Sequence, residues 1–417
     1  MKKVKTRLSS EKATIASNYG YLLFLQGANY LLPLILLPFL VRVLGTEKYG
    51  LVMFAQSTAV ILSVIVDFGF NLSGTREVSM VAKEKKKLSE VFSAIIILKI
   101  ALTTAAFLIL VLVTFSFERF SIDQEVYILS FGVVIGQALF PTWFFQGIEK
   151  MKVITAINVL AKVIFTALVF VIVKDETQYL LVPTFNSLGF IISGFLGVII
   201  SFKYVKIVMP KFALIKSLFL ESRVLFFSNL GASLSTSANV LVLGLFAGNS
   251  TVGVYSSIEK LIIATKNIYT PFFQAAYSWL SKQTKRKKIA AIKKILPVMF
   301  FVGLLISSTI LLFGKKILIL IYDNELISSY ANVFKIISFI AFLSAIYMTF
   351  ITMYFPSEKQ YNIRMRILVT GGIVNLIMAF LLVNLYGIYG TAIACVLTEA
   401  LLLLLAIYFF KKTTKNE

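Results

Sequence analysis

The hydrophobic positions of the chain fall in long runs that short polar segments separate. Most runs match or exceed the roughly 20 residues that a helix needs to cross the hydrocarbon core of a bilayer. The pattern predicts twelve membrane-spanning helices, near residues 16–41, 49–72, 91–117, 126–147, 153–173, 179–202, 224–247, 252–279, 295–313, 331–355, 367–385 and 388–410. The segments between them are too short for a large water-soluble domain. We therefore expect an all-α, polytopic membrane protein.

The composition agrees with the pattern. Hydrophobic residues make up 59% of the 417 residues and charged residues only 14%, whereas soluble domains carry about a quarter charged residues. The first run follows a basic tail and could imitate a signal peptide. It is too long for one and lacks a cleavage site of small residues, so we expect it to be retained as the first helix.

The basic residues follow an alternating pattern along the chain. The net charge of +22 would ordinarily suggest a nucleic-acid partner. With the N-terminus placed inside, however, the cytoplasmic segments hold 30 of the 41 Lys and Arg residues, and the opposite loops hold six. Cytoplasmic loops retain Lys and Arg next to anionic lipid head groups. The basic runs at 83–87 and 282–288 are therefore interpreted as topology signals, with both termini cytoplasmic.

An internal repeat relates the two halves. The segment GTEKYGLV, residues 45–52, aligns with GNSTVGVY, residues 248–255, at a constant offset of 203. Both segments join two spans, where glycine suits a tight turn. We expect a parallel repeat of six plus six helices, with an N-lobe at 1–208, a C-lobe at 209–417 and a site between the lobes. Chance similarity between short apolar segments is the alternative.

Four motifs stand at predicted span ends and turns: VRVLGTEKYGL at 41–51, DFGFNLSGTREVS at 67–79, PTWFFQGIEKMK at 141–152 and VGVYSSIEKL at 252–261. They resemble motifs of Wzx-type O-antigen flippases, which form the polysaccharide transporter branch of the multidrug, oligosaccharidyl-lipid and polysaccharide exporter superfamily. The resemblance implies two six-helix lobes around a central cavity, which helices one, two, seven and eight line. It does not indicate which glycan is carried.

The resemblance also implies a function. Family members pass an undecaprenyl-pyrophosphate-linked oligosaccharide from the cytoplasmic to the periplasmic leaflet of the bacterial inner membrane by alternating access, in lipopolysaccharide biosynthesis. Membrane lipid and the lipid-linked oligosaccharide would be partners, and a polysaccharide polymerase and chain-length proteins are candidates. No nucleic acid is expected as a partner.

Several lysines lie inside predicted spans, where a charge costs about 2.5–3.5 kcal/mol or more at the bilayer centre. Lys260 and Lys266 lie deep in the eighth span, and Arg42 lies near the outer end of the first. We expect these three to compensate a pyrophosphate group in a wet cavity. Lys99 and Lys162, in the third and fifth spans, are further candidates for the cavity wall. Alternatives are internal ion pairs and side chains that extend toward the interface.

Acidic residues in the spans are candidates for ion coupling or gating. Glu259 and Lys266 are seven residues apart and share a helix face, so an ion-pair network that only packs the bundle is an alternative. Asp67 is expected to pair with Arg76. Glu399 has no cation adjacent in sequence, so it is the better candidate for Na⁺ or H⁺ coupling, because a carboxyl in a low dielectric has a raised proton affinity.

The sequence argues against an enzyme. There is no His and a single Cys, so metal sites built on these residues and His-based catalysis are not expected. A membrane glycan polymerase would need placed acids and bases, yet only four Asp occur and no D-x-D. A G-x-x-x-x-G-K phosphate loop is also missing. A drug or cation antiporter of the same superfamily is a closer alternative, but lysine-bearing spans disfavour cationic substrates. Apart from a coupling Na⁺ or H⁺ ion, no cofactor is expected.

Overall fold

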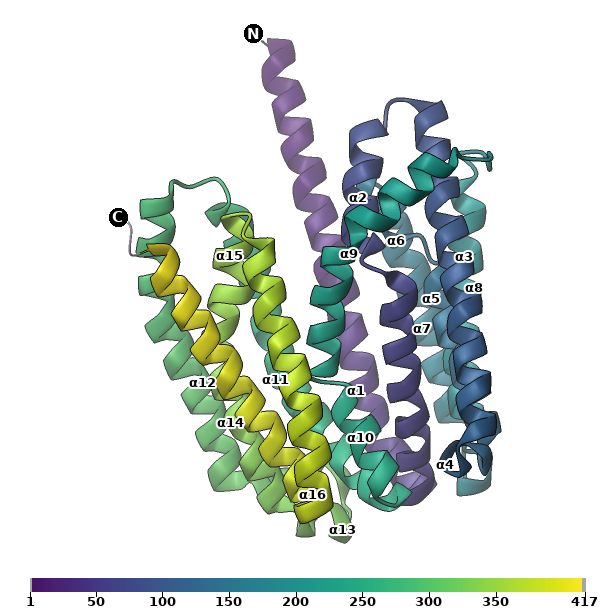
Figure 1. Cartoon of the computed structure of the whole chain (residues 1–417), viewed down its shortest axis with the longest axis vertical. Helices are drawn as coiled ribbons and strands as arrows, with labels where there is room; N and C mark the ends of the chain where they lie inside the picture. The colour runs from purple at the N-terminus through teal and green to yellow at the C-terminus, as the bar shows by residue number, and fades with distance from the viewer. Residues whose placement is uncertain (1, 415–417) are drawn as a thin grey trace. The chain divides into compact units, whose positions relative to one another are not determined.

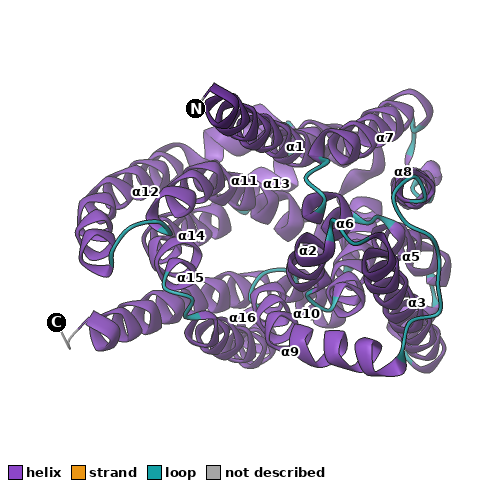
Figure 2. Cartoon of the chain, turned by 90° about the horizontal axis from the view of Figure 1, so that it is seen from above, coloured by secondary structure: helices purple, strands orange, loops and turns teal. Residues whose placement is uncertain are grey.

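The computed structural model describes the backbone of residues 2–414. It also describes their side chains, except those of 2–26, 28–31, 271, 274, 275 and 278. The described chain consists of helices joined by loops and turns, with no β-strand in residues 2–414 (Figures 1 and 2). The predicted all-α membrane fold is confirmed.

The helices of the first half run from the N-terminus to Ser201. They are α1 (Lys2–Asp67), α2 (Phe70–Val81), α3 (Lys85–Ser116), α4 (Glu118–Ser121), α5 (Gln124–Leu139), α6 (Thr142–Gly147), α7 (Met151–Ile172), a 3₁₀ turn (Glu176–Gln178) and α8 (Leu181–Ser201). The second half contains α9 (Phe212–Leu234), α10 (Ala238–Phe246), α11 (Asn249–Leu280), α12 (Lys285–Tyr322), α13 (Glu325–Ser329), α14 (Ala331–Met348), a π-helix (Thr349–Tyr354), α15 (Phe355–Ser357) and α16 (Tyr361–Thr414).

Within the part of the chain that the structure describes, eight helical segments are long and apolar enough to cross a membrane. The bent pair of α9 and α10 would make a ninth. Two of the longest helices are each two helices joined at a break, because Gly45 in α1 (φ 66°, ψ 171°) and Gly387 in α16 (φ 54°, ψ −129°) leave helical geometry. Only glycine adopts these dihedral angles at low cost. Each break coincides with a predicted turn between spans, whereas the total of twelve spans stays a prediction.

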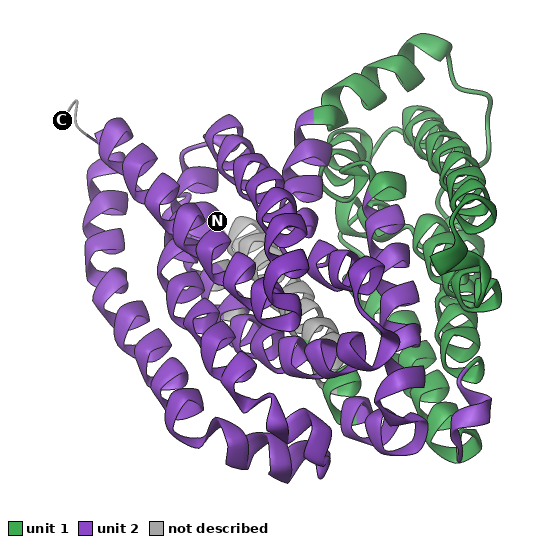
Figure 3. Ribbon diagram, turned by 60° about the horizontal axis from the view of Figure 1, so that its bottom comes forward, with its two compact units in different colours: residues 1–35, 65–173, 180–223 green, residues 36–64, 174–179, 224–417 purple. Residues whose placement is uncertain are grey.

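The chain divides into two compact units (Figure 3). Unit 1 comprises residues 1–35, 65–173 and 180–223, and unit 2 comprises residues 36–64, 174–179 and 224–417. Residues 36–64 of α1 therefore pack with the second half of the chain rather than with their own half. The predicted lobes at 1–208 and 209–417 follow the sequence repeat, which is a different division of the chain. The two compact units do not test these lobes, so the lobes stay a prediction.

The segment that precedes α9 is fixed to unit 1. The backbone N–H groups of Lys206 and Val208 donate to Ser89 Oγ (3.1 Å) and Ser93 Oγ (3.0 Å) of α3. Farther along, the Ser73 and Ser222 hydroxyls lie 2.7 Å apart. Two α3 side chains thus satisfy backbone donors of a loop that has no secondary structure of its own. The basic segment before α9 is consequently held in place rather than freely solvated.

In unit 2, the repeated segments contact each other through their glycines. A Cβ on Gly50 would lie 1.8 Å from the Asn249 carbonyl oxygen, and a Cβ on Gly253 would lie 2.0 Å from the Thr46 carbonyl oxygen. The hydroxyls of Thr46 and Ser250 are 2.9 Å apart. Thr46 and Asn249, like Gly50 and Gly253, are equivalent at the offset of 203, so the same contact occurs twice. We call this reciprocal contact the glycine crossing. It gives the sequence repeat a structural counterpart.

The glycine crossing predicts that a single methyl group is destabilising. Small residues let two membrane helices approach closely, and Gly50→Ala or Gly253→Ala would force their backbones apart. We expect each variant to lower the free energy of unfolding by about 1–3 kcal/mol, the usual cost of overpacking. Thermal unfolding of the purified protein in detergent measures this. Gly27→Ala is the control, because a Cβ there meets no atom within 4 Å. Unchanged melting in both crossing variants would contradict the prediction.

Candidate functional site

Unit 2 contains a buried ion pair between α11 and α16. Lys266 Nζ lies 2.6 Å from Glu399 Oε1, and the Glu399 side chain is 5% exposed. The same ammonium donates to Tyr347 Oη of α14 at 3.3 Å. These contacts join three helices, so the pair also packs the bundle. Glu399 has no cation adjacent in sequence, but Lys266 approaches it from another helix.

Two charged residues about two turns before Lys266 on α11, Glu259 and Lys260, do not take part in this ion pair. Glu259 is buried at 9% exposure, and Lys260 is half-buried. Glu259 forms no ion pair with Lys266, whose partner is Glu399. Tyr255 Oη lies 3.1 Å from Cys395 Sγ and joins the same two helices. Among the described side chains, Lys260 forms no salt bridge, and its charge acts on the carboxyl group of the adjacent Glu259.

Four buried amide or carboxylate oxygens in unit 2 lack a hydrogen-bond donor among the described residues. They are Asn239 Oδ1, Gln360 Oε1, Asn375 Oδ1 and Glu399 Oε2. The amide of Asn375 is oriented by its own donation to Thr398 Oγ1 at 3.1 Å. Buried acceptors without a donor are uncommon and require an explanation. These oxygens have capacity to accept a proton, a water molecule or a cation. No group of three or more His, Cys, Asp or Glu in the described part of the chain is placed to hold a metal ion.

Unit 1 contains a second buried pair. Lys99 Nζ of α3 lies 3.6 Å from Asp67 Oδ1 at the end of α1, and the lysine side chain is only 3% exposed. Arg76, the predicted partner of Asp67, pairs instead with Glu77 at 3.5 Å and is 70% exposed. The reason is local, because Phe68 (φ 46°) and Gly69 (φ 81°) interrupt the helix between Asp67 and α2. Helical spacing cannot predict a pair across such a break.

The two remaining cation candidates meet other groups. Lys162 Nζ lies 5.2 Å from the centroid of the Phe190 ring, a cation–π contact within unit 1. Arg42 is exposed, and its Nε donates to the carbonyl oxygen of Tyr322 at 3.3 Å. Tyr322 is the last residue of α12. The arginine therefore caps a helix C-terminus, where carbonyl groups lack intrahelical donors and a positive charge is favourable.

One buried pair at the start of α12 was not predicted from the sequence. Lys288 Nζ contacts Glu358 Oε1 at 2.6 Å and the Ser357 carbonyl oxygen at 2.7 Å, and Lys288 is 6% exposed. Its neighbours Arg286 and Lys287 are exposed. The run at 282–288 contains seven residues of similar polarity, so composition alone does not single out the buried lysine.

Comparison with known proteins gives consistent results. The family described as "Polysaccharide biosynthesis protein" matches residues 15–283. The "Putative O-antigen transporter" of Escherichia coli (strain K12) is 29% identical over 418 aligned residues, which cover 97% of this chain and 98% of that protein. The protein of the same name from Shigella dysenteriae is 30% identical and covers 92% of this chain and 97% of its own length.

Solved structures share the fold. An inward-facing multidrug resistance MATE family transporter of the MOP superfamily matches with a TM-score of 0.70 at 14% identity and covers 92% of this chain and 94% of that one. The lipid II flippase MurJ in an inward closed conformation matches with a TM-score of 0.70 at 13% identity and covers 95% and 87%. At these identities the likeness concerns the fold alone.

The pair of Lys266 and Glu399 predicts strong energetic coupling. Lys266→Met leaves the Glu399 carboxylate buried without its cation, and Glu399→Gln leaves the Lys266 ammonium buried without its anion. Loss of one partner of a buried ion pair lowers the free energy of unfolding by about 3–5 kcal/mol. The double variant removes both charges, so we expect it to lose less than the sum of the two. Chemical or thermal unfolding in detergent measures the cycle. Lys316→Met, at an exposed lysine, is the control. Additive losses would show that the two groups are not coupled.

Proposed function

Because the chain belongs to the polysaccharide biosynthesis protein family, we propose that it is a flippase that moves a lipid-linked oligosaccharide across the bacterial inner membrane. The proposed substrate is an undecaprenyl-pyrophosphate-linked repeat unit of O-antigen or a similar surface polysaccharide. Movement runs from the cytoplasmic to the periplasmic leaflet by alternating access, with both termini in the cytoplasm. The names of the two full-length relatives and the apolar helices support this proposal.

The observation that carries the proposal is that some lysines in the spans form salt bridges and Lys260 does not. Lys99 and Lys266 are compensated by Asp67 and Glu399 within their own units. Lys260 is half-buried and forms no salt bridge among the described side chains, and its charge acts only through space on Glu259 beside it on the same helix. A span cation without a salt bridge is costly unless water or an anion compensates it. A passing pyrophosphate group would supply that anion, which makes Lys260 the principal substrate contact. Lys162 and Arg42 are secondary candidates.

Coupling to an ion gradient is proposed at the α11–α16 pair. One Glu399 oxygen holds Lys266 while the other, Oε2, has no donor among the described residues. A Na⁺ ion or a proton that bound there would compete with the lysine for the same carboxylate. Lys266 would then be released when the ion binds, and the contacts between α11, α14 and α16 would change together. This exchange would link ion binding to the arrangement of the helix that carries Lys260.

The sign of the charge at position 260 tests the proposed function. In a strain that lacks this chain and accumulates lipid-linked glycan on the cytoplasmic face, we expect wild-type protein to restore surface polysaccharide. Lys260→Arg should retain more transport than Lys260→Ala, and Lys260→Glu should retain least. Each loss of roughly 1.4 kcal/mol in substrate binding corresponds to about a tenfold weaker affinity. Surface polysaccharide and leaflet-resolved lipid-linked glycan are the readouts.

Membrane levels of each variant must be matched, so that loss of transport is not loss of protein. Lys316→Glu provides a control in which the same charge reversal occurs at an exposed lysine. Equal transport by the arginine, alanine and glutamate variants would remove Lys260 from the substrate path. Failure of wild-type protein to restore the polysaccharide would refute the proposed function itself.

A further inference from the structure

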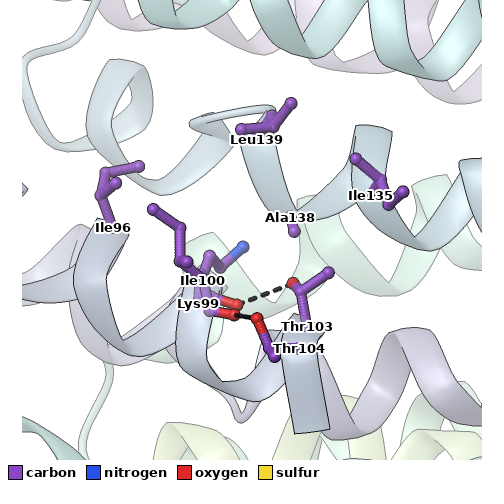
Figure 4. A pocket seen from close by; sticks show the side chains of 8 residues that line it. All are labelled: Ile96, Lys99, Ile100, Thr103, Thr104, Ile135, Ala138 and Leu139. Atoms are coloured by element: carbon purple, nitrogen blue, oxygen red, sulfur yellow. Dashed lines mark hydrogen bonds between the residues drawn. The ribbon is translucent and has the colours of Figure 1, made fainter. Parts of the chain in front are cut away.

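A cavity of about 140 Å³ lies between α3 and α5 in unit 1 (Figure 4). Its walls come from two helices only. They are Ile96, Lys99, Ile100, Thr103 and Thr104 of α3, and Ile135, Ala138 and Leu139 of α5. Lys99 is 14 residues past the start of α3 at Lys85, or about 21 Å along the helix. The cavity is therefore near the middle of a spanning helix rather than at head-group level.

The polar atoms of the cavity wall already have partners. The Thr103 hydroxyl donates to the Lys99 carbonyl at 2.7 Å, and the Thr104 hydroxyl donates to the Ile100 carbonyl at 3.1 Å (Figure 4). The Lys99 ammonium faces Asp67 at 3.6 Å, which neutralises its charge. What remains for a ligand is a surface of isoleucine, leucine and alanine side chains. This chemistry selects a hydrocarbon rather than a phosphate or a sugar.

The cavity opens onto an apolar surface of α3. Ile100, in its wall, is 55% exposed, and Leu108, Leu112 and Phe115 farther along the same helix are 62%, 65% and 73% exposed. In a membrane-spanning helix, an exposed stripe that is apolar except for Thr104 faces lipid chains. The opening is thus continuous with the lipid-facing surface, and its occupant comes from the bilayer.

We propose that an acyl chain of a membrane phospholipid occupies this cavity. An apolar cavity of roughly 150 Å³ stays free of water and accepts a guest of the size of benzene, so a chain segment of about that size fills the space. The seated chain packs on Ile135 and Ala138 and covers the lipid side of Lys99. It keeps water from the Lys99–Asp67 pair, and so strengthens the attraction that holds α3 to the end of α1.

Bulky substitutions in the cavity test the proposal. Ala138→Phe fills the cavity from inside, and Thr104→Trp blocks its opening from an exposed position, where packing is not disturbed. Ala105→Phe adds the same bulk at an exposed residue of α3 outside the cavity. Purified full-length proteins are compared by native mass spectrometry for retained phospholipid, and by melting temperature in detergent with and without added phosphatidylglycerol, phosphatidylethanolamine or undecaprenyl phosphate.

Wild-type protein and Ala105→Phe should retain phospholipid and melt at a higher temperature when it is added. Ala138→Phe and Thr104→Trp should bind it about tenfold more weakly, the loss expected from about two buried methylene groups, and should not be stabilised. If Ala138→Phe does not fold, Thr104→Trp decides. Equal lipid retention by all four proteins would overturn the proposal. Stabilisation by undecaprenyl phosphate alone would also overturn it, because the occupant would then be a polyprenyl chain.

Discussion

The structure depends on the neutralisation of charge inside a hydrocarbon medium. A lysine within a spanning helix is tolerated only if a carboxylate, water or a ligand compensates it. Lys99 and Lys266 satisfy this requirement with Asp67 and Glu399, each on a helix distant in sequence. An ion pair of this kind fixes which helix faces meet, since displacement of either helix would leave a buried charge unpaired. Lys260, on the same helix as Lys266, is the contrasting case.

Backbone geometry imposes the second constraint. A helix in a bilayer satisfies its own hydrogen bonds, so the chain can change direction only where a residue tolerates a break. Gly45 and Gly387 provide such breaks with positive φ inside α1 and α16, and Gly69 does so between α1 and α2. Positions where the backbone of one helix meets another likewise require glycine. Gly136, for instance, would place a Cβ 2.2 Å from the Phe190 carbonyl carbon.

Much of the fold was readable from the sequence, because the bilayer makes hydrophobic length a strong signal. The apolar runs, the turn at Gly45, the boundary between the spans at 367–385 and 388–410 and the family resemblance were all predicted. The 203-residue offset also found its counterpart in the glycine crossing. The partners of the charged residues were not predictable. Asp67 and Lys99 are 32 residues apart and Lys266 and Glu399 are 133 apart, and such pairs depend on helix rotation that a single sequence does not encode locally.

The glycine crossing has an implication for how such a chain arises. Gly50 contacts Asn249, and Gly253 contacts Thr46. Since Asn249 is the repeat equivalent of Thr46 and Gly253 that of Gly50, both sides of the contact use the same surface, as in an isologous interface. A half-length ancestor with one such glycine would supply both sides of the interface by self-association about a two-fold axis, as symmetric dimers do. Fusion of two gene copies would then preserve the contact without any new complementary residue. After fusion the two copies are free to diverge, as Thr46 and Asn249 have done, provided that both glycines remain.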